Sequence, residues 1–220
     1  MIAVAIDGPA GAGKSTIAKF AAKELGFIYV DTGALYRAIG YFALSKGADT
    51  RNADNVNALL PGIDVKLAFS GGVQRVILNG QDVSELIRTP EVSMAASDVS
   101  AIKEVRAFLF DLQRNIAKEN NVIMDGRDIA TVVLPDAKVK IFLTASPEDR
   151  AKRRYDELIG KGQDVDFDDV LADMKERDYN DSTRATAPLK PAEDSIIVDT
   201  TGNTLEQSIE QLVTIIKSRV

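Results

Sequence analysis

The sequence of 220 residues contains no cysteine and no histidine. Without cysteine there can be no disulfide and no thiolate zinc site, and this composition suits a reducing compartment. Without histidine there can be no Ser-His catalytic pair, no histidine-ligated metal and no imidazole general base. A phosphate acceptor would need no such base, because the second pKa of a phosphate group is about 6 and the group is largely deprotonated at neutral pH.

Long apolar runs and long basic runs are also lacking. No apolar run approaches the roughly 20 residues of a membrane span, so we expect no membrane association. The net charge is −6 and the pI is near 4.9, whereas a duplex nucleic-acid binder usually carries a basic stripe. We therefore expect no nucleic-acid partner, and the local basic clusters favour a small anionic ligand. The N-terminus enters an apolar strand without a basic segment, which predicts no signal peptide and a cytoplasmic protein; we also expect a monomer.

The remaining composition, 45% hydrophobic and 27% charged, is ordinary for a soluble protein, and the length suits one α/β domain. Amphipathic helical patterns alternate with five short apolar runs, which predicts a parallel sheet covered by helices on both faces. The predicted strands are Ile2–Ile6, Phe27–Val30, Val122–Met124, Val139–Leu143 and Ser195–Val198. Helices are expected to begin at Ser146 and Thr204, where capping patterns occur. In the first helix, one buried face is expected to hold Ile17, Phe20, Ala21 and Leu25.

Two segments interrupt this alternation. Between about residues 60 and 88, alternating apolar residues, Gly71-Gly72 and then Asn79-Gly80 predict a small antiparallel β insertion. The segment of about 150–189 is charged and rich in arginine, and we expect it to form a mobile lid. The predicted division is a core of residues 1–31, 89–145 and 190–220, an acceptor-binding region of 32–88, and this lid.

A phosphate-binding motif directly follows the first predicted strand and opens a helix. It matches G-x-x-x-x-G-K-[ST] in the run Gly8-Pro9-Ala10-Gly11-Ala12-Gly13-Lys14-Ser15. Inward-turned backbone N–H groups and the helix N-terminus would hold phosphate oxygens. Lys14 is placed for the β- and γ-phosphates and the Ser15 hydroxyl for Mg²⁺. The pattern predicts an α/β fold of the P-loop NTPase type, with three layers around the five-stranded parallel sheet.

Two further patterns lie at predicted strand ends. Asp125 tips the strand Val122–Met124 and is expected to hold Mg²⁺ or its water. Thr32 and Arg37 begin a helix after the second strand, and a hydroxyl, helix N–H groups and an arginine together suit a second anion. Two anion sites at neighbouring strand ends favour two phosphate-bearing substrates.

Over nearly its whole length the chain resembles bacterial-type cytidylate kinases. The resemblance is carried by a series of short motifs: Asp7–Lys14, Asp31–Arg37, Ile87-Arg88-Thr89, Ala95-Ala96-Ser97, Val105-Arg106, Asp125-Gly126-Arg127-Asp128, Pro135-Asp136-Ala137, Arg153-Arg154, Glu176-Arg177-Asp178, Asp181, Arg184 and Ala187-Pro188-Leu189. It implies transfer of the γ-phosphoryl group of ATP to CMP or dCMP, with Mg²⁺ as cofactor.

The resemblance also implies roles for particular residues. Ser97, Arg106 and Asp128 would face the cytosine, and Arg37 and Arg127 would hold the acceptor phosphate. The implied catalytic residues are Lys14, Arg127, Arg177 and Arg184. The implied ATP-binding residues are Gly8, Pro9, Ala10, Gly11, Ala12, Gly13, Lys14, Ser15, Thr16 and Arg154. The implied acceptor-binding residues are Thr32, Tyr36, Arg37, Ser97, Arg106, Arg127, Asp128, Arg177, Asp181 and Arg184.

Some features leave alternatives open. Asn180 and Ser182 stand where some relatives place arginines, so the lid is less basic and its contacts to ATP are not defined by the pattern. Each lid arginine could instead be a solvated residue in an ion pair. A kinase for another small acceptor, such as UMP or shikimate, and a nucleotide-dependent switch without an acceptor are the two alternative functions.

Overall fold

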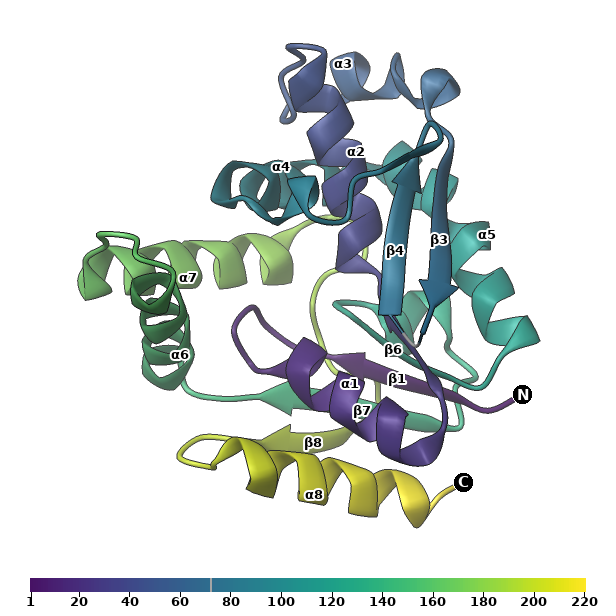
Figure 1. Cartoon of the computed structure of the whole chain (residues 1–220), viewed down its shortest axis with the longest axis vertical. Helices are drawn as coiled ribbons and strands as arrows, with labels where there is room; N and C mark the ends of the chain where they lie inside the picture. The colour runs from purple at the N-terminus through teal and green to yellow at the C-terminus, as the bar shows by residue number, and fades with distance from the viewer. Residues whose placement is uncertain (72) are drawn as a thin grey trace.

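The computed structural model of the chain describes residues 1–71 and 73–220 (Figure 1). Five strands form one parallel sheet in the order β2-β6-β1-β7-β8, which confirms the predicted sheet. These strands are β1 (Ala3–Asp7), β2 (Ile28–Asp31), β6 (Val122–Gly126), β7 (Val139–Thr144) and β8 (Ile196–Asp199). Each runs one or two residues further towards its carboxyl end than the apolar pattern predicted, because hydrogen bonding continues past the last apolar residue.

Helices cover both faces of this sheet, as the apolar strands require. Alternate residues of each strand face opposite sides, so Val4 and Ile6 pack against helices α1 (Lys14–Leu25) and α8 (Leu205–Lys217). Ala5 faces the other side, where α5 (Lys103–Glu119) and the short π-helix η3 (Ile129–Val133) lie. The chain therefore has the predicted three layers.

The predicted β insertion is a second, antiparallel sheet in the order β3-β4-β5. Its strands are β3 (Val65–Ser70), β4 (Val73–Leu78) and β5 (Gln81–Asp82). Asn79 and Gly80 join β4 to β5, and both have positive φ angles, 49° and 82°, which is the turn geometry that this pair favours. Gly72, which belongs to the predicted Gly-Gly turn, lies outside the described residues.

Three helices surround this small sheet: α2 (Gly33–Ser45), α3 (Ala53–Asn57) and α4 (Pro90–Ser100). The sequence patterns had not predicted α3 or α4. Apolar residues of α4, among them Val92 and Val99, share one core with α2, β3 and β4. Two 3₁₀ turns, η1 (Leu60–Gly62) and η2 (Leu86–Arg88), complete the region. The predicted division of the chain stays a prediction, but α4 packs with the acceptor-binding region.

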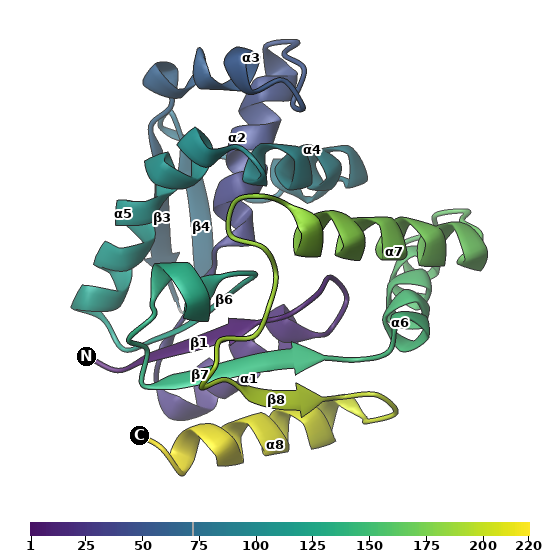
Figure 2. The same cartoon turned by 180° about the vertical axis from the view of Figure 1, so that it is seen from behind.

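The arginine-rich segment forms two helices, α6 (Pro147–Gly160) and α7 (Phe167–Thr183), which we call the lid helices. They pack on each other through a small apolar cluster of their own, and α7 reaches from α6 towards α4 (Figure 2). Ser146 caps α6 and Thr204 with Gln207 forms a capping box on α8, as predicted.

One expected core position is wrong. Phe20 is half exposed, and the buried face of α1 consists of Ile17, Ala18, Ala21 and Ala22. Small alanines let α1 approach the sheet closely, and this leaves Phe20 on the outer side of the helix. Within the described part of the chain, we find no helix that combines the length and the apolar character needed to cross a bilayer.

Candidate active site

The P-loop, residues 8–15, leaves the carboxyl end of β1 and runs into α1. A Cβ atom at Gly8 would lie only 1.9 Å from the carbonyl oxygen of Leu143 in β7, so the loop can pass the neighbouring strand only with glycine there. The Lys14 side chain is buried, and its ammonium group donates to the carbonyl oxygen of Pro9 at 2.7 Å. The fold thus presents Lys14 inside the loop, as the motif predicted.

Ser15 and Asp125 meet beside this loop. The Ser15 hydroxyl donates to Asp125 Oδ2 at 2.8 Å, and the Tyr29 hydroxyl approaches Asp125 Oδ1 at 3.2 Å. Burial and the nearby carboxylate of Asp31 raise the pKa of Asp125 to about 6. Two adjacent oxygen ligands at a strand tip suit Mg²⁺, which usually keeps few protein ligands and binds phosphate oxygens as well. In the described residues no three histidine, cysteine or acidic side chains gather into a cage for a metal.

A second set of polar groups begins helix α2. Asp31 accepts from the N–H group of Ala34 at 3.0 Å and from Arg37 at 2.6 Å, so it caps the helix and orients the arginine. The Gln74 side chain, from the β insertion, pairs with the backbone N–H and carbonyl groups of Asp31. The Thr32 hydroxyl donates to the carbonyl oxygen of Asp125 at 2.8 Å. These contacts hold Arg37 beside the carboxyl end of β6, which is the neighbour of β1 in the sheet.

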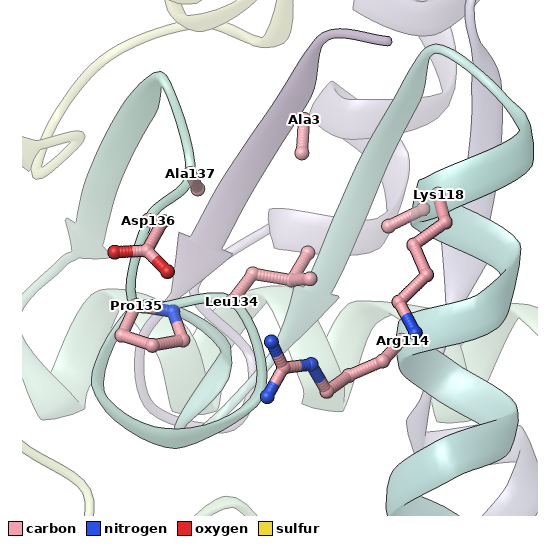
Figure 3. A pocket seen from close by; sticks show the side chains of 8 residues that line it. Ala3, Arg114, Lys118, Leu134, Pro135, Asp136 and Ala137 are labelled. Atoms are coloured by element: carbon pink, nitrogen blue, oxygen red, sulfur yellow. The ribbon is translucent and has the colours of Figure 1, made fainter.

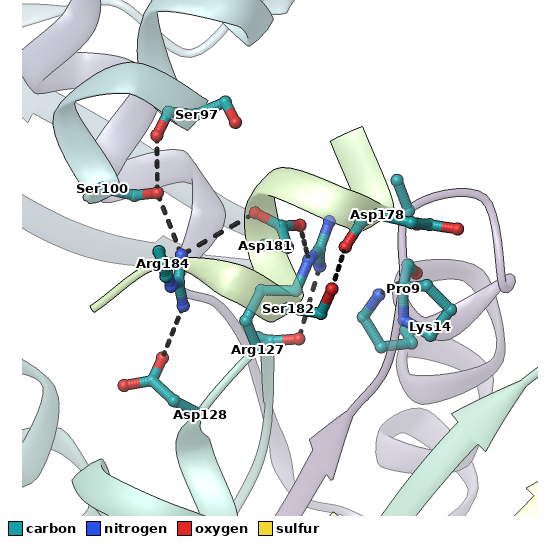
Figure 4. Close-up of polar contacts among 12 residues, drawn as sticks. Pro9, Lys14, Ser97, Ser100, Arg127, Asp128, Asp178, Asp181, Ser182 and Arg184 are labelled. Carbon is teal, nitrogen blue, oxygen red and sulfur yellow. Dashed lines mark hydrogen bonds and ion pairs between the residues drawn. The ribbon is translucent and has the colours of Figure 1, made fainter. Parts of the chain in front are cut away.

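Arg127, which directly follows β6, and Arg184, at the end of lid helix α7, bring further positive charge to the same place. Arg127 donates to Asp181 at 2.8 Å, and Arg184 donates to Ser100 of α4 at 3.1 Å. Figure 4 shows Arg127, Asp181 and Arg184 lying between α4 and Lys14. The structure therefore brings the predicted lid residues together with the predicted residues of the core.

Two of the residues predicted to face the base, Arg106 and Asp128, are in contact. Arg106 donates to Asp128, both side chains are buried, and the Arg106 guanidinium lies over the Tyr36 ring at 5.4 Å. Arg184 lies 4.0 Å from the second carboxylate oxygen of Asp128. Ser97 lines a cleft of about 240 Å³ between α4 and α7, together with Arg177. Asn180, where some relatives place an arginine, lines the same cleft.

Several cations of the site have lowered pKa values or, among the described residues, donor groups that are not satisfied. Burial and the neighbouring charge of Arg127 lower the pKa of Lys14 to about 7. The same two causes lower the pKa of Arg177 to about 10. In the described part of the chain, the buried side-chain nitrogen atoms without a hydrogen-bond partner are Arg37 Nε, Arg177 Nε and Arg184 Nη2. Since buried donors are normally satisfied, this cluster fits an anionic ligand with several oxygen acceptors.

One arginine beside the P-loop, Arg150, was missed by the sequence reasoning, and Arg153 was named there only as part of a motif. Arg150 is buried and donates to Ala10 of the P-loop at 3.0 Å and to Asp178 of α7 at 2.6 Å. Arg153 donates to the carbonyl oxygen of Thr200 at 2.8 Å. The predicted ATP ligand Arg154 forms an ion pair with Glu157 at 2.8 Å, and its role stays a prediction. The helical spacing of these arginines from the cap at Ser146 could have shown that Arg150 lies near the base of the helix.

A second depression lies at the opposite edge of the sheet (Figure 3). It is lined by Ala3 at the start of β1, by Arg114 and Lys118 of α5, and by residues 134–137. None of the predicted site residues lines it, so the carboxyl edge of the sheet is the candidate active site.

Comparison with known proteins agrees with this geometry. The model of the cytidylate kinase family matches residues 4–218. The chain belongs to the cytidylate kinase family. Relatives named cytidylate kinase include one from Caldicellulosiruptor saccharolyticus, 52% identical over 96% of this chain and 94% of that protein, and one from Carboxydothermus hydrogenoformans, 49% identical over 97% and 96%.

A solved structure of an uncharacterized protein from Eubacterium ventriosum covers the whole of both chains with a TM-score of 0.55 and 14% identity. At this identity the likeness concerns the fold alone. Membership in the cytidylate kinase family confirms the predicted family and enzyme class. The site described above lies at the carboxyl edge of the parallel sheet, the edge at which open α/β sheets generally bind ligands.

Proposed function

We propose that this chain transfers the γ-phosphoryl group of ATP to the phosphate of CMP or dCMP, giving ADP and CDP or dCDP. The proposal is carried by three buried arginine nitrogens, on Arg37, Arg177 and Arg184, that have no hydrogen-bond partner within the described part of the chain. Two phosphorylated substrates supply the many oxygen acceptors that such a cluster requires. A monomer acting in the cytoplasm on these soluble substrates is part of the proposal.

The chain's own residues act mainly by position and charge. The P-loop holds the phosphates of ATP with its N–H groups and Lys14, while Arg37 and Arg127 hold the acceptor phosphate. An oxygen of that phosphate attacks the γ-phosphorus in line, and the bond to the β-phosphate oxygen breaks. Lys14, Arg177 and Arg184 neutralise the charge on the transferring group. No general base is needed, because the acceptor phosphate is already largely ionised at neutral pH.

Ser15 and Asp125 are the groups that would hold Mg²⁺, since their oxygens lie together beside Lys14. When bound, the metal supplies positive charge to the β- and γ-phosphate oxygens. Arg150 links the P-loop to α7 through Ala10 and Asp178. This link places the lid arginines over the phosphates and keeps water from competing with the acceptor.

On the base side, Asp128 accepts a hydrogen bond from the amino group of cytosine and Arg106 donates to its ring acceptors. Uracil presents a carbonyl oxygen where cytosine presents the amino group, so two acceptors would face each other. The arrangement therefore favours CMP over UMP.

The test is production of ADP from ATP and Mg²⁺ with CMP, dCMP, UMP, AMP, GMP or shikimate offered in turn. We expect CMP or dCMP to give the highest kcat/KM. A higher kcat/KM with UMP or shikimate would show that CMP and dCMP are not the preferred acceptors. Slow ATP hydrolysis at a rate that CMP does not change would instead indicate a nucleotide-dependent switch without an acceptor.

A further inference from the structure

Asp7 is a buried acid that the mechanism above does not use. It ends strand β1, directly before the P-loop, and only 1% of its surface is exposed. Both of its carboxylate oxygens accept backbone N–H groups from a segment far away in the sequence: Oδ1 from Ile129 at 2.8 Å and Oδ2 from Ala130 at 2.7 Å. A buried carboxylate with these two hydrogen bonds fixes the end of β1 relative to the segment that follows β6.

The two N–H groups belong to the first turn of the π-helix η3, and the N-cap residue of that helix is Asp128. Aspartate is among the strongest N-cap residues, because its side chain usually accepts the free N–H groups of the first turn. Among the residues that the structure describes, the Asp128 side chain makes no such bond. Asp7 takes the N–H groups instead, and Asp128 points to Arg106 and Arg184.

We infer that Asp7 is a positioning residue that sets the preference for cytosine: by capping η3 from outside, it leaves the Asp128 carboxylate free to face the base. This inference rests on the proposed function, since it concerns the acceptor site of that reaction. Without Asp7, the Asp128 carboxylate has two unpaired N–H groups within its own helix turn. It would turn towards them and away from the base.

The experiment measures kcat/KM for CMP and for UMP at pH 8 in the wild type, Asp7→Asn, Asp128→Ala and the double variant. Asparagine has the size of aspartate, but its NH₂ group would face one of the two backbone N–H groups that Asp7 accepts. Two donors would then oppose each other. We expect Asp7→Asn to lower the CMP-to-UMP ratio by about tenfold or more, because misplacing a group by about 1 Å can cost on the order of 10²-fold. In the Asp128→Ala protein, Asp7→Asn should alter the CMP-to-UMP ratio by less than about twofold. Asp7 acts on the ratio through Asp128, and the effects of two coupled substitutions do not add.

Val4→Ala is the matched control, because Val4 is buried on the same strand and faces α1 and α8. It should lower the melting temperature and leave the ratio unchanged. If Asp7→Asn also lowers only the melting temperature, or if its effect on the ratio is the same with and without Asp128, the inference is wrong.

Calorimetric titration with CMP and with UMP gives the same ratio from binding, without turnover. If the wild type proved inactive, the proposed function would be contradicted. The binding ratio would still test the role of Asp7. Should Asp7→Asn not fold, amide exchange in the wild-type protein decides: Ile129 and Ala130 should be protected by about 10²-fold or more before any nucleotide is added. Rapid exchange of both amides in the ligand-free protein would contradict the inference.

Discussion

At the scale of single residues, the site is defined by buried cations whose pKa values are lowered by burial and by the neighbouring charge of Arg127. Lys14 is the clearest case, because burial and Arg127 lower its pKa to about 7 in the absence of a nucleotide. A polyphosphate beside this amine restores its charge. The residue is therefore prepared for an anion.

Lys14→Ala should leave the fold intact and nearly abolish turnover. Removing an electrostatic group that faces the transferring phosphoryl commonly costs on the order of 10²-fold or more in kcat. Steady-state kinetics checks this, with Lys23→Ala as the control, since Lys23 is an exposed lysine of the same helix. A kcat close to that of the wild type would remove the P-loop lysine from the mechanism.

Asp128→Ala should reduce kcat/KM strongly for CMP and much less for UMP. A buried acceptor left without its donor costs roughly 1–3 kcal/mol, which corresponds to about tenfold to a few hundredfold. The alternative is that Asp128 only shapes the loop through its contact with Arg106. Under that alternative both acceptors would be affected alike, so an unchanged CMP-to-UMP ratio would end the claim of base recognition.

Asp7 should also leave a signature in the pH dependence of stability. Burial raises its pKa to about 7, against the opposing effect of the Ala130 and Ile129 N–H groups. Because this exceeds the unfolded value of 3.8, the folded protein binds the extra proton between these pH values. The stability from this proton is fully present below pH 3.8 and is lost as the pH rises to about 7.

Urea unfolding at pH 5 and at pH 7.5 measures this effect. Relative to Asp7→Asn, the wild type should be more stable at pH 5 than at pH 7.5 by on the order of 2 kcal/mol. The difference between the two proteins removes the contributions of groups that both retain. A difference that does not change with pH would show that the folded and unfolded pKa values of Asp7 are similar.

At the scale of elements, the lid helices carry cations to a site that the sheet has already formed. Helix α6 starts at the end of β7, and Arg150 fastens it to the P-loop and to α7. Helix α7 then places Arg177 and Arg184 beside α4. In the proposed complex, we expect the two arginines to contact the phosphates fully only when α7 lies against α4.

Arg177→Ala and Arg184→Ala should therefore lower kcat far more than they weaken ATP binding. Arginines that neutralise charge in the transition state are worth roughly 10³-fold or more. Kinetics and direct titration with ATP separate the two effects. Lys175→Ala is the matched control, because Lys175 is an exposed residue of the same helix and forms an ion pair with Glu148. Loss of ATP affinity at an unchanged kcat would make both arginines ground-state binding residues.

At the scale of the whole molecule, the candidate site draws its residues from the parallel sheet, from α2 and α4, and from the lid helices. CMP and ATP each contact more than one of these parts in the proposed complex. Binding to the folded state alone stabilises a protein by about 2.7 kcal/mol at a ligand concentration of 100 Kd.

CMP at that concentration should accordingly raise the melting temperature by roughly 5–10 °C for a chain of this size. UMP at the same concentration should raise it much less. Thermal unfolding followed by circular dichroism checks this, and the Asp128→Ala protein serves as the control in which the two shifts should converge. Equal shifts with CMP and UMP in the wild type would contradict selection of the base at the binding step.

The sequence by itself determined the sheet, the P-loop and the family. Apolar strands, helix caps and the Asn79-Gly80 turn are local patterns, because their residues are close neighbours along the chain. The motif at residues 8–15 is also local, since a phosphate loop is built from consecutive backbone N–H groups. For this reason Lys14, Ser15 and the strand tip at Asp125 could be placed in advance.

The tertiary structure alone decided which charges meet. Asp7 and Ala130 lie 123 positions apart, and Arg150 and Ala10 lie 140 positions apart. No spacing rule links such pairs, because their distance depends on how strands and helices pack. The same holds for α4, whose small apolar residues fit against α2 and the β insertion. The capping of η3 by Asp7, which leaves Asp128 free to face the base, exists only because β1 and β6 are neighbours in the sheet.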